Sequence, residues 1–528
     1  MYTHKSISYL INYTVVVSIV TMDTLSSLHQ LEHVAISSVS RLLSITRWIL
    51  LTLLKPFVVC ILWALRCMTN CARVLQKRRK RTKLKIAIVG GGPAGASLAY
   101  LLHSEVDNIS IDIYEQSNRI GGQSESIKIG KHLYEMGTIY LTVGYLSVMR
   151  LVRLMGLNML KMQQKNTYLT ADNKKYDICP TISTVKFSLY FMFYWVKWKL
   201  SKQDTNPTHE YNHVIFNDWL KSKKLIMSDP LVQMATTGQL YGPPSDITVW
   251  NAFQWIKPSL FFTAATWDGW IIKEGFQTLW KRLIEESRAH VHLKSTVSVC
   301  ESNTDGTVRL TYKSKKITHH VKYDHVFITI PLDTVANPLT PLITDKFRSQ
   351  YILVNLVKVE NWPFDTSVVY TFNDKRVQNM SSIGRFPVQE TKKSDYPTKS
   401  TFITSFYRLG QTYPVQSLAS LVTSGINQLK SVGGMGSIGP VAHTNLSRYN
   451  VTYSEKQFRD RLPQTIESLQ GTGNVWYGGG TLSHWNANSI VNQNVHLLQL
   501  FRKQTRDSHW LDSLYTRLLP LFLCAFDW

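Results

Sequence analysis

The chain has 528 residues, and its 59 basic and 35 acidic side chains give a net charge of +24. At about 150 residues per domain, this length predicts three to four units. Hydrophobic content of 44% and charged content of 18% exclude a disordered or fibrous protein, and six cysteines are too few for a disulfide scaffold.

The basic excess is concentrated near the N-terminus. Between His33 and Ser104 there is no Asp or Glu, while Lys and Arg side chains supply half of the imbalance. A nucleic-acid-binding protein would spread such charge over its folded surface. We therefore expect a local role for these residues and no nucleic-acid partner.

Residues 1–82 are predicted to anchor the chain in a membrane. Trp48–Leu65 is an apolar run of just sufficient length to cross a bilayer as a helix, although Lys55 near its middle costs about 2.5–3.5 kcal/mol. The basic run Lys77–Arg81 predicts that the following residues lie in the cytoplasm, as expected for a single-pass protein. The alternatives are a buried or in-plane helix with a solvated linker, and a nuclear-localisation patch.

A dinucleotide fingerprint follows the basic run. Lys85–Val89 is predicted to be a short strand that leads through a G-x-G-x-x-G turn into a helix. The first glycine permits a tight turn, the second lets a pyrophosphate approach the backbone, and the third lets helix and strand pack closely. The helix N-terminus presents free N–H groups to the phosphates. The predicted binding residues are Gly90, Gly92, Pro93, Ala94 and Gly95.

A second predicted strand completes the nucleotide-binding unit. Ile109–Tyr114 alternates apolar and polar residues and ends at Glu115, twenty positions after Gly95. An acid at this spacing accepts hydrogen bonds from ribose hydroxyls. The alternative is a glycine-rich turn in a sheet that binds no nucleotide.

The next residues resemble a known superfamily. Gln116–Ser124 contains R-x-G-G, and this arrangement resembles the flavoprotein superfamily of amine oxidases, phytoene desaturases and protoporphyrinogen oxidases. The resemblance implies bound FAD, with this turn extending the pyrophosphate cradle. It also implies that a segment similar to Tyr134–Thr138 lies beside the flavin. The residues implied are Gln116, Arg119, Gly121, Gly122, Gly137 and Thr138.

The resemblance continues along the chain. Gly275–Trp280 resembles the turn and helix that re-enter the FAD domain, and Val291–Val299 resembles a strand whose Val297 meets adenine through its backbone. Val475–Thr481 resembles the last strand and turn, which includes Gly479. The helix Ser489–Phe501 would then direct its first residues, Ser489 and Ile490, toward the flavin pyrimidine.

Two departures from the superfamily concern the C-terminal motif. The usual acid after the glycine of the last turn is replaced here by Gly480 and Thr481, and the aromatic residue that amine oxidases place on the final helix is missing. His484 and Trp485 are the candidates for side chains near the flavin ring, with simple packing as the alternative for both. The spacing also resembles fungal cyclopiazonate-dehydrogenase-like flavoproteins.

The resemblance implies an α/β fold in which a Rossmann-type, glutathione-reductase-like FAD domain is interleaved with an α+β substrate domain. We assign FAD-domain segments to 83–150, 270–345 and 465–505, substrate-domain segments to 151–269 and 346–464, and a tail to 506–528. The aromatic run from Phe187 to Val196 predicts a helix that lines an apolar cavity or dips into a membrane surface; the alternative is an ordinary core helix.

The predicted activity is that of an FAD-dependent oxidase or dehydrogenase. A hydrophobic small molecule would give a hydride to flavin N5, and oxygen or another carrier would accept the electrons. The alternatives are a non-catalytic binder similar to Rab-escort and GDP-dissociation-inhibitor proteins, and a flavin-binding pseudoenzyme. His319 and His320 lie on a predicted strand with no third ligand in sequence, so we expect no metal site.

Overall fold

The computed structural model describes residues 83–505 with internal gaps. The gaps are 131, 162–165, 170–174, 177–181, 201–210, 212–213, 226–231, 233–234, 258–259, 261–268, 361, 363–367, 372–378, 385–399, 410–415 and 433–435. The predicted anchor in 1–82 and the tail 506–528 lie outside the described residues. Among the helices that are described, none combines the length and the apolar character needed to cross a bilayer.

The first layer of the fold is a five-stranded parallel sheet in the order β10-β2-β1-β14-β20. Its strands come from three distant parts of the chain. They are β1 (Leu84–Val89), β2 (Ile109–Tyr114), β10 (His290–His292), β14 (His325–Ile328) and β20 (Val475–Tyr477). This arrangement confirms a Rossmann-type sheet assembled from interleaved segments; the exact domain boundaries stay predictions.

Both faces of this sheet are covered, as parallel sheets require. Ile86 and Ile88 of β1 pack with three helices, whereas Ala87 and Val89 pack on the opposite side. The helices are α3 (Pro93–Glu105), α10 (Phe276–Ser287) and α14 (Ala487–Thr505). The opposite side carries an antiparallel sheet of β11 (Ser295–Ser302), β12 (Val308–Ser314) and β13 (Ile317–Tyr323).

One predicted strand is divided in the structure. Val291–Val299 was expected to be continuous, but β10 ends at His292 and β11 begins at Ser295. Lys294 adopts φ +53° between them, and its N–H donates to the carbonyl of Ser117. The turn moves the chain from the parallel sheet to the antiparallel sheet, so alternation alone could not show the break.

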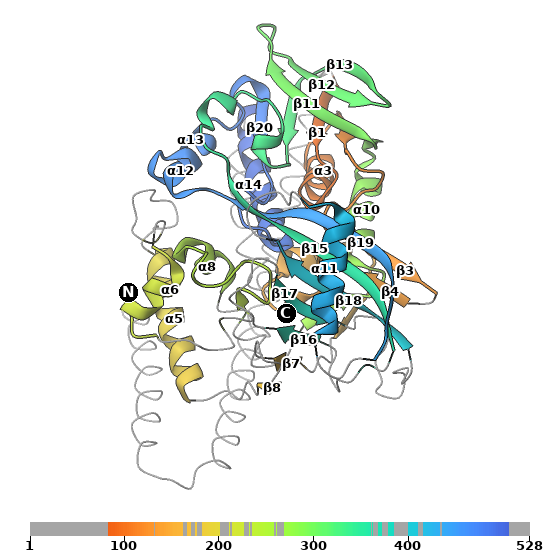
Figure 1. Ribbon diagram of the computed structural model, residues 1–528. Coiled ribbons are helices and arrows are strands. Elements are labelled where there is room, and N and C mark those ends of the chain that lie inside the picture. Colours follow the sequence, from red (N-terminus) through yellow and green to blue (C-terminus); the bar gives the residue numbers. More distant parts are fainter. Residues whose placement is uncertain are drawn as a thin grey trace, which may run out of the picture. The chain divides into compact units, whose positions relative to one another are not determined.

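A second, seven-stranded sheet has the order β19-β15-β18-β17-β16-β7-β8. Helix α11 (Leu418–Lys430) packs on one face of it (Figure 1), because Leu353, Val357 and Ile403 form a cluster with its Leu421 and Leu429. The strands are β7 (Asn166–Leu169), β8 (Lys175–Tyr176), β15 (Arg348–Glu360), β16 (Val368–Thr371), β17 (Asn379–Gly384), β18 (Ser400–Arg408) and β19 (Ile438–Thr452).

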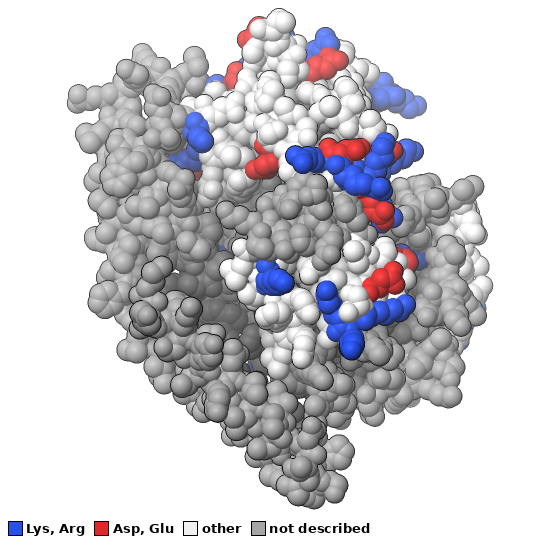
Figure 2. All heavy atoms as spheres, turned by 90° about the vertical axis from the view of Figure 1, so that its left-hand side faces the viewer, with Lys and Arg blue, Asp and Glu red and all other residues white. Residues whose placement is uncertain are grey.

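The remaining described strands and α-helices connect these sheets and helices. The strands are β3 (Ser126–Ile129), β4 (His132–Glu135), β5 (Leu141–Thr142), β6 (Met159–Lys161) and β9 (Gly269–Ile272). The helices are α4 (Leu146–Leu154), α5 (Ile182–Leu200), α6 (Phe216–Ser222), α8 (Val249–Trp255), α12 (Glu455–Arg459) and α13 (Leu462–Ser468). On the face shown in Figure 2, basic and acidic side chains of the described part are interspersed.

Helix α5 has one packed side and one exposed side. Phe191 and Trp198 are fully buried, and Phe191 packs edge-on against Trp219 and Phe253. The helix therefore contributes to a core, in agreement with the alternative of an ordinary core helix. Its other side exposes large apolar residues, which an ordinary core helix would not do. They are Leu189, Tyr190, Phe193, Val196 and Leu200.

Candidate functional site

The fingerprint turn joins β1 to α3, and its glycines are required for different reasons. A Cβ on Gly95 would lie 1.9 Å from the carbonyl oxygen of Gly90, and a Cβ on Gly90 would lie 2.7 Å from Ile330. Close packing of the protein itself therefore demands these two glycines. Gly92 differs, because a Cβ there would meet nothing nearer than the Gly122 Cα at 3.6 Å. The space beside Gly92 is what a pyrophosphate needs for close approach to the backbone.

The R-x-G-G turn lies directly against the fingerprint, as predicted. The Gly121 N–H donates to the Gly91 carbonyl at 3.0 Å, and Gly122 adopts φ +53° with its Cα facing Gly92. Pro93 forms the first residue of α3 and contributes no N–H, while Ala94 is buried behind it. The two glycine turns thus form a single concave backbone surface at the N-terminus of α3.

Glu115 connects this cradle to the end of β2. Its carboxylate is buried, one oxygen accepts the Gly91 N–H at 2.8 Å, and the other accepts the Ser117 N–H at 2.8 Å. An ionised carboxylate has about four acceptor positions, so both oxygens can still accept a ribose hydroxyl. Gln116 is exposed beside it. The predicted acid is therefore in place, and it also fixes the turn.

Arg119 carries a buried guanidinium nitrogen that the described protein leaves without a partner. Its Nε lies 2.9 Å from a carboxylate oxygen of Glu125, but its Nη1 is buried and makes no hydrogen bond to the described residues. Glu125 is itself buried and accepts from the Asn445 amide at 2.8 Å. A buried unpaired donor costs about 1–3 kcal/mol. A phosphate oxygen matches it well, because guanidinium groups pair strongly with phosphate.

The segment predicted beside the flavin is closely packed against this turn. A Cβ on Gly137 would lie 1.8 Å from the Gln123 carbonyl oxygen, and Thr138 Oγ1 lies 3.1 Å from the Ser124 hydroxyl. The preceding Glu135 is fully buried, and burial raises its carboxyl pKa to about 8. Its oxygens accept from the Phe276 N–H and the Ser126 hydroxyl, so it holds the start of α10.

Val297, which the resemblance assigns to adenine, lies near the start of β11. The Ser295 N–H donates to the Glu115 carbonyl at 2.9 Å and thereby places the start of β11 beside the end of β2. Val297 is buried, and a bulge follows it in the pairing with β12. Val297 therefore follows by two residues the backbone N–H that bonds to Glu115, the residue that would meet the ribose.

The last turn returns to the end of β1. The Thr329 N–H donates to the Val89 carbonyl at 3.0 Å, and a Cβ on Gly479 would lie 2.6 Å from the Thr329 carbonyl oxygen. Helix α14 then lies against the fingerprint helix. Asn494, which is fully buried, donates to the Ala94 carbonyl at 2.7 Å and to the Ser97 hydroxyl at 2.8 Å.

The start of α14 is capped by a residue that the sequence interpretation did not identify. The Asn486 side chain accepts the Ser489 N–H at 2.9 Å and donates to the Ser489 hydroxyl at 2.9 Å. The Ile490 N–H bonds to the Asn486 carbonyl at 3.1 Å. Both predicted amides therefore already have an acceptor within the cap. Their assignment to the flavin remains a prediction.

His484 is held in a buried aromatic cluster. Its ring stacks on Trp255 at 6.0 Å and lies 4.9 Å from the ring of Tyr241. Burial, assisted by the positive charge of Lys257, lowers its pKa to about 3, so the imidazole is neutral. The Asn486 amide, oriented by its cap, donates to Nδ1 at 2.9 Å and leaves the proton on Nε2.

Trp485 lies beside this cluster and closes it toward β19. Its indole N–H donates to the Val451 carbonyl at 2.6 Å, and Tyr449 contacts it edge-on at 6.0 Å. Tyr449 also stacks on Tyr241 at 5.8 Å, and burial raises the pKa of Tyr449 to about 12. His484 and Trp485 are therefore packed, and together with Tyr241, Trp255 and Tyr449 they form a group of rings that we call the aromatic wall.

The charged side chain of Lys257 lies close to His484 and to the start of α14. Lys257 Nζ is 3.5 Å from the Ser489 hydroxyl, in the first turn of α14. The partial positive charge of a helix N-terminus adds to this ammonium charge. The region around the start of α14 and Lys257 therefore favours negative charge on a bound group.

The predicted FAD-site residues thus converge around the ends of β1 and β2, and the residues present fit FAD. Packing of the protein does not require the glycine at position 92, Arg119 offers a donor to a pyrophosphate, and Glu115 offers acceptors to a ribose. Sequence reasoning missed Lys257, Tyr241 and Tyr449. No spacing motif links these residues to the fingerprint.

Comparisons with known proteins agree with this geometry. A family model for the NAD(P)-binding Rossmann-like domain matches residues 88–153. Prenylcysteine oxidase 1 of Rattus norvegicus is 23% identical over 293 residues, which are 48% of this chain and 57% of that protein, and the Mus musculus protein is similar to the same degree. The chain thus aligns over little more than half the length of these curated relatives.

Solved structures cover more of the chain. A CLA-producing fatty acid isomerase from P. acnes has a TM-score of 0.65 at 16% identity, over 80% of this chain and all of that one. A protein assigned as a protoporphyrinogen oxidase from Exiguobacterium has 0.59 at 13%, over 80% and 100%. A putrescine oxidase triple mutant has 0.58 at 14%, over 80% and 99%.

The chain has the fold of the FAD-dependent amine oxidase superfamily. The superfamily predicted from the motifs is therefore confirmed at the level of the fold. The family model covers the fingerprint, within residues 88–153. The residues of the aromatic wall lie outside this matched range.

Proposed function

We propose that this chain is an FAD-dependent oxidoreductase that oxidises a hydrophobic small molecule. The observation that carries the proposal is the contrast within the fingerprint. Gly90 and Gly95 are required by protein packing, whereas the atoms nearest to a Cβ on Gly92 lie at ordinary contact distances of 3.6 and 3.9 Å. Packing alone therefore does not account for a glycine at position 92, whereas the close approach of a pyrophosphate does.

When bound, FAD supplies a hydride acceptor at its N5 atom. The Gly92 and Gly122 turns and Arg119 would hold its pyrophosphate, and Glu115 would hold its ribose. The aromatic wall of Tyr241, Trp255, His484, Tyr449 and Trp485 excludes water from the neighbouring space. Lys257 and the start of α14 favour negative charge there, which suits a cofactor that becomes anionic on reduction.

A hydrophobic substrate is proposed from the same wall. Its tyrosines are held neutral by burial, and His484 is neutral as well, so the wall offers apolar faces rather than charge. The name of the curated relative, prenylcysteine oxidase, refers to a substrate with a prenyl chain, which supports the same class. Oxygen or another carrier is proposed as the electron acceptor.

Membrane association is proposed as the route to such a substrate. Leu189, Phe193, Val196 and Leu200 follow one another at helical spacing on α5, with Phe193 62% and Leu200 80% exposed. Lys197 and Lys199 lie on the same helix. An exposed apolar stripe beside lysines is typical of a helix that lies in a membrane surface. With the anchor predicted in 1–82, this supports a single-pass protein whose catalytic domain is cytoplasmic.

The test begins with the colour of the purified full-length protein. We expect flavin absorbance and FAD release on denaturation, and loss of the oxidised-flavin absorbance when a prenylated thioether is added without oxygen. A wild-type protein that holds no FAD, even after reconstitution, contradicts the proposal and favours a non-catalytic binder of lipidated partners. A protein that holds FAD but is bleached by no apolar donor favours a pseudoenzyme.

Gly92→Val is the decisive variant. Position 92 has φ −80°, and the nearest atom to an added Cβ is 3.6 Å away, so the protein itself tolerates a side chain there. We expect a folded, colourless protein. Retention of FAD by this variant would contradict the assignment of this cradle.

A further inference from the structure

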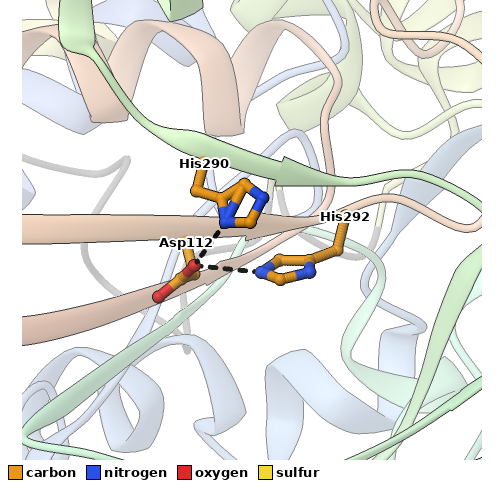
Figure 3. A group of neighbouring side chains, drawn as sticks. All are labelled: Asp112, His290 and His292. Carbon is orange, nitrogen blue, oxygen red and sulfur yellow. Dashed lines mark hydrogen bonds and ion pairs between the residues drawn. The ribbon is translucent and has the colours of Figure 1, made fainter.

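Two histidines and an aspartate meet at the edge of the parallel sheet, away from the glycine turns. Strand β10 is the edge strand, and it pairs with β2 so that His290 is opposite Asp112 and His292 is opposite Tyr114. Because alternate residues of a strand share a face, Asp112, His290 and His292 project from the same side of the sheet. Figure 3 shows the two imidazoles directed toward the carboxylate.

The distances within this group are close to those of a metal centre. His292 Nε2 lies 2.9 Å and His290 Nδ1 lies 3.6 Å from the same oxygen of Asp112. One ligand atom from each residue lies within 4.8 Å of the others. With bonds of about 2.0–2.2 Å to zinc, neighbouring ligands of a tetrahedral ion are about 3.3 Å apart. Movements of well under a side-chain length would admit the ion.

We propose that Asp112, His290 and His292 bind a divalent transition metal of the zinc and copper class, which fastens the edge strand β10 to β2. Two imidazoles and one carboxylate favour these ions over magnesium or calcium, which prefer oxygen ligands throughout. A water molecule completes a four-coordinate ion, since the His290 side chain is 74% exposed.

The surroundings orient the ligands before the metal arrives. The Tyr114 ring stacks on His292 with 4.5 Å between centroids and 7° between planes. The Tyr114 hydroxyl is fixed in turn by the Tyr323 hydroxyl at 2.6 Å. These contacts restrict the His292 ring on its buried side. Asp112 and His292 are each only 25% exposed, so they are the more rigid members of the group.

The metal acts on the strand that carries the nucleotide-binding acid. Asp112 precedes Glu115 by three residues, and the Glu115 N–H donates to the His292 carbonyl at 3.0 Å. A tie between β10 and β2 therefore supports the backbone from which Glu115 reaches the fingerprint turn. Glu115 itself lies outside the metal group, and the metal is assigned no part in the oxidation.

The experiment is titration of the chelator-treated full-length protein with zinc chloride, followed by calorimetry. Full-length wild type is expected to bind one zinc equivalent more than His290→Ala and His292→Ala. His320→Ala is the matched control, because His320 is exposed on the neighbouring strand β13 and bonds to Thr311. It should bind as many equivalents as wild type. Equal stoichiometry in wild type and both ligand variants would overturn the site.

Two further measurements separate a metal site from damage to the fold. The first is electron paramagnetic resonance with Cu²⁺ as the probe, in which wild type should show coupling to two imidazole nitrogens that His290→Ala reduces. The second is thermal unfolding. Zinc should raise the melting temperature of wild type by a few degrees and leave that of His290→Ala unchanged, because only a bound ion stabilises the folded state. Zinc binding without this rise would overturn the proposed tie between the strands.

Discussion

The glycine cradle and the aromatic wall are built on different principles. The cradle consists of backbone, and its residues lie within a short stretch of chain that forms a strand, a turn and a helix. The wall consists of side chains, and Tyr241 comes from a segment that is distant in sequence from those of Tyr449 and His484. Under the proposed function, the nucleotide would be held by a local motif, whereas selection of the substrate would depend on the tertiary fold.

The strongest test of this contrast compares two glycines of the cradle. Gly95→Ala places a Cβ 1.9 Å from the Gly90 carbonyl oxygen, so we expect loss of folded protein. Gly92→Ala meets no atom nearer than 3.6 Å, so we expect a normal fold with weakened FAD binding. Circular dichroism and the FAD content per chain measure the two effects. Similar behaviour of the two variants would show that the glycines do not have separate roles.

The second prediction concerns the contact that joins α14 to the fingerprint helix α3. Asn494 is fully buried and donates to Ala94 and Ser97, so Asn494→Ala leaves buried acceptors unpaired and opens a small cavity. We expect a loss of about 2–3 kcal/mol in the free energy of unfolding, measured with denaturant. Asn492→Ala removes only an exposed hydrogen bond, which Asn492 accepts from the Ser147 hydroxyl, and should change this free energy by less than about 1 kcal/mol.

The cradle could be predicted from the sequence because the residues that it requires lie at fixed, short spacings. The glycines of the turn and the acid at the end of the next strand form a recognisable motif. The confirmed strands β1 and β2 follow from the same pattern. The final helix was predicted from Ser489, and its start at Ala487 differs because the Asn486 cap was not recognised.

The histidine–aspartate group and the aromatic wall could not be predicted from the sequence, because each depends on contacts between distant parts of the chain. Asp112 and His292 are 180 positions apart and meet only because β10 pairs with β2 in parallel. The sequence instead drew attention to His319 and His320, which are adjacent and therefore point to opposite faces of β13. The aromatic wall was missed likewise, since aromatic residues alone are usual in a core.

The third prediction tests whether the substrate side of the molecule meets a membrane. Phe193→Ser removes an exposed aromatic side chain from α5, and should weaken binding of a chain starting at residue 83 to anionic vesicles by roughly tenfold, or about 1.5 kcal/mol. Ile317→Ser is the control, because Ile317 is 60% exposed on β13. Equal flotation of both variants with vesicles would exclude α5 as the contact, and retained FAD would show that each is folded.

The smallest expected effect concerns the wall itself and its neutral histidine. Burial lowers the pKa of His484 to about 3, whereas its ordinary value is 6.5, so below pH 6.5 the unfolded chain takes up a proton that the folded chain refuses. The contribution of His484 to the free energy of unfolding is therefore fully present above pH 6.5 and is lost as the pH falls toward 3. Between pH 7.5 and 5.5 this loss is on the order of 1 kcal/mol.

His484→Gln should remove that part of the pH dependence while leaving the rest. Burial lowers the pKa of His325 to about 4, so its contribution persists in the variant and serves as an internal reference. The comparison uses the change in unfolding free energy between the two pH values, because the substitution also alters absolute stability. An unchanged slope in His484→Gln would mean that His484 is reached by water. The wall would then fail to keep its surroundings dry, and the main argument for an apolar substrate would be lost.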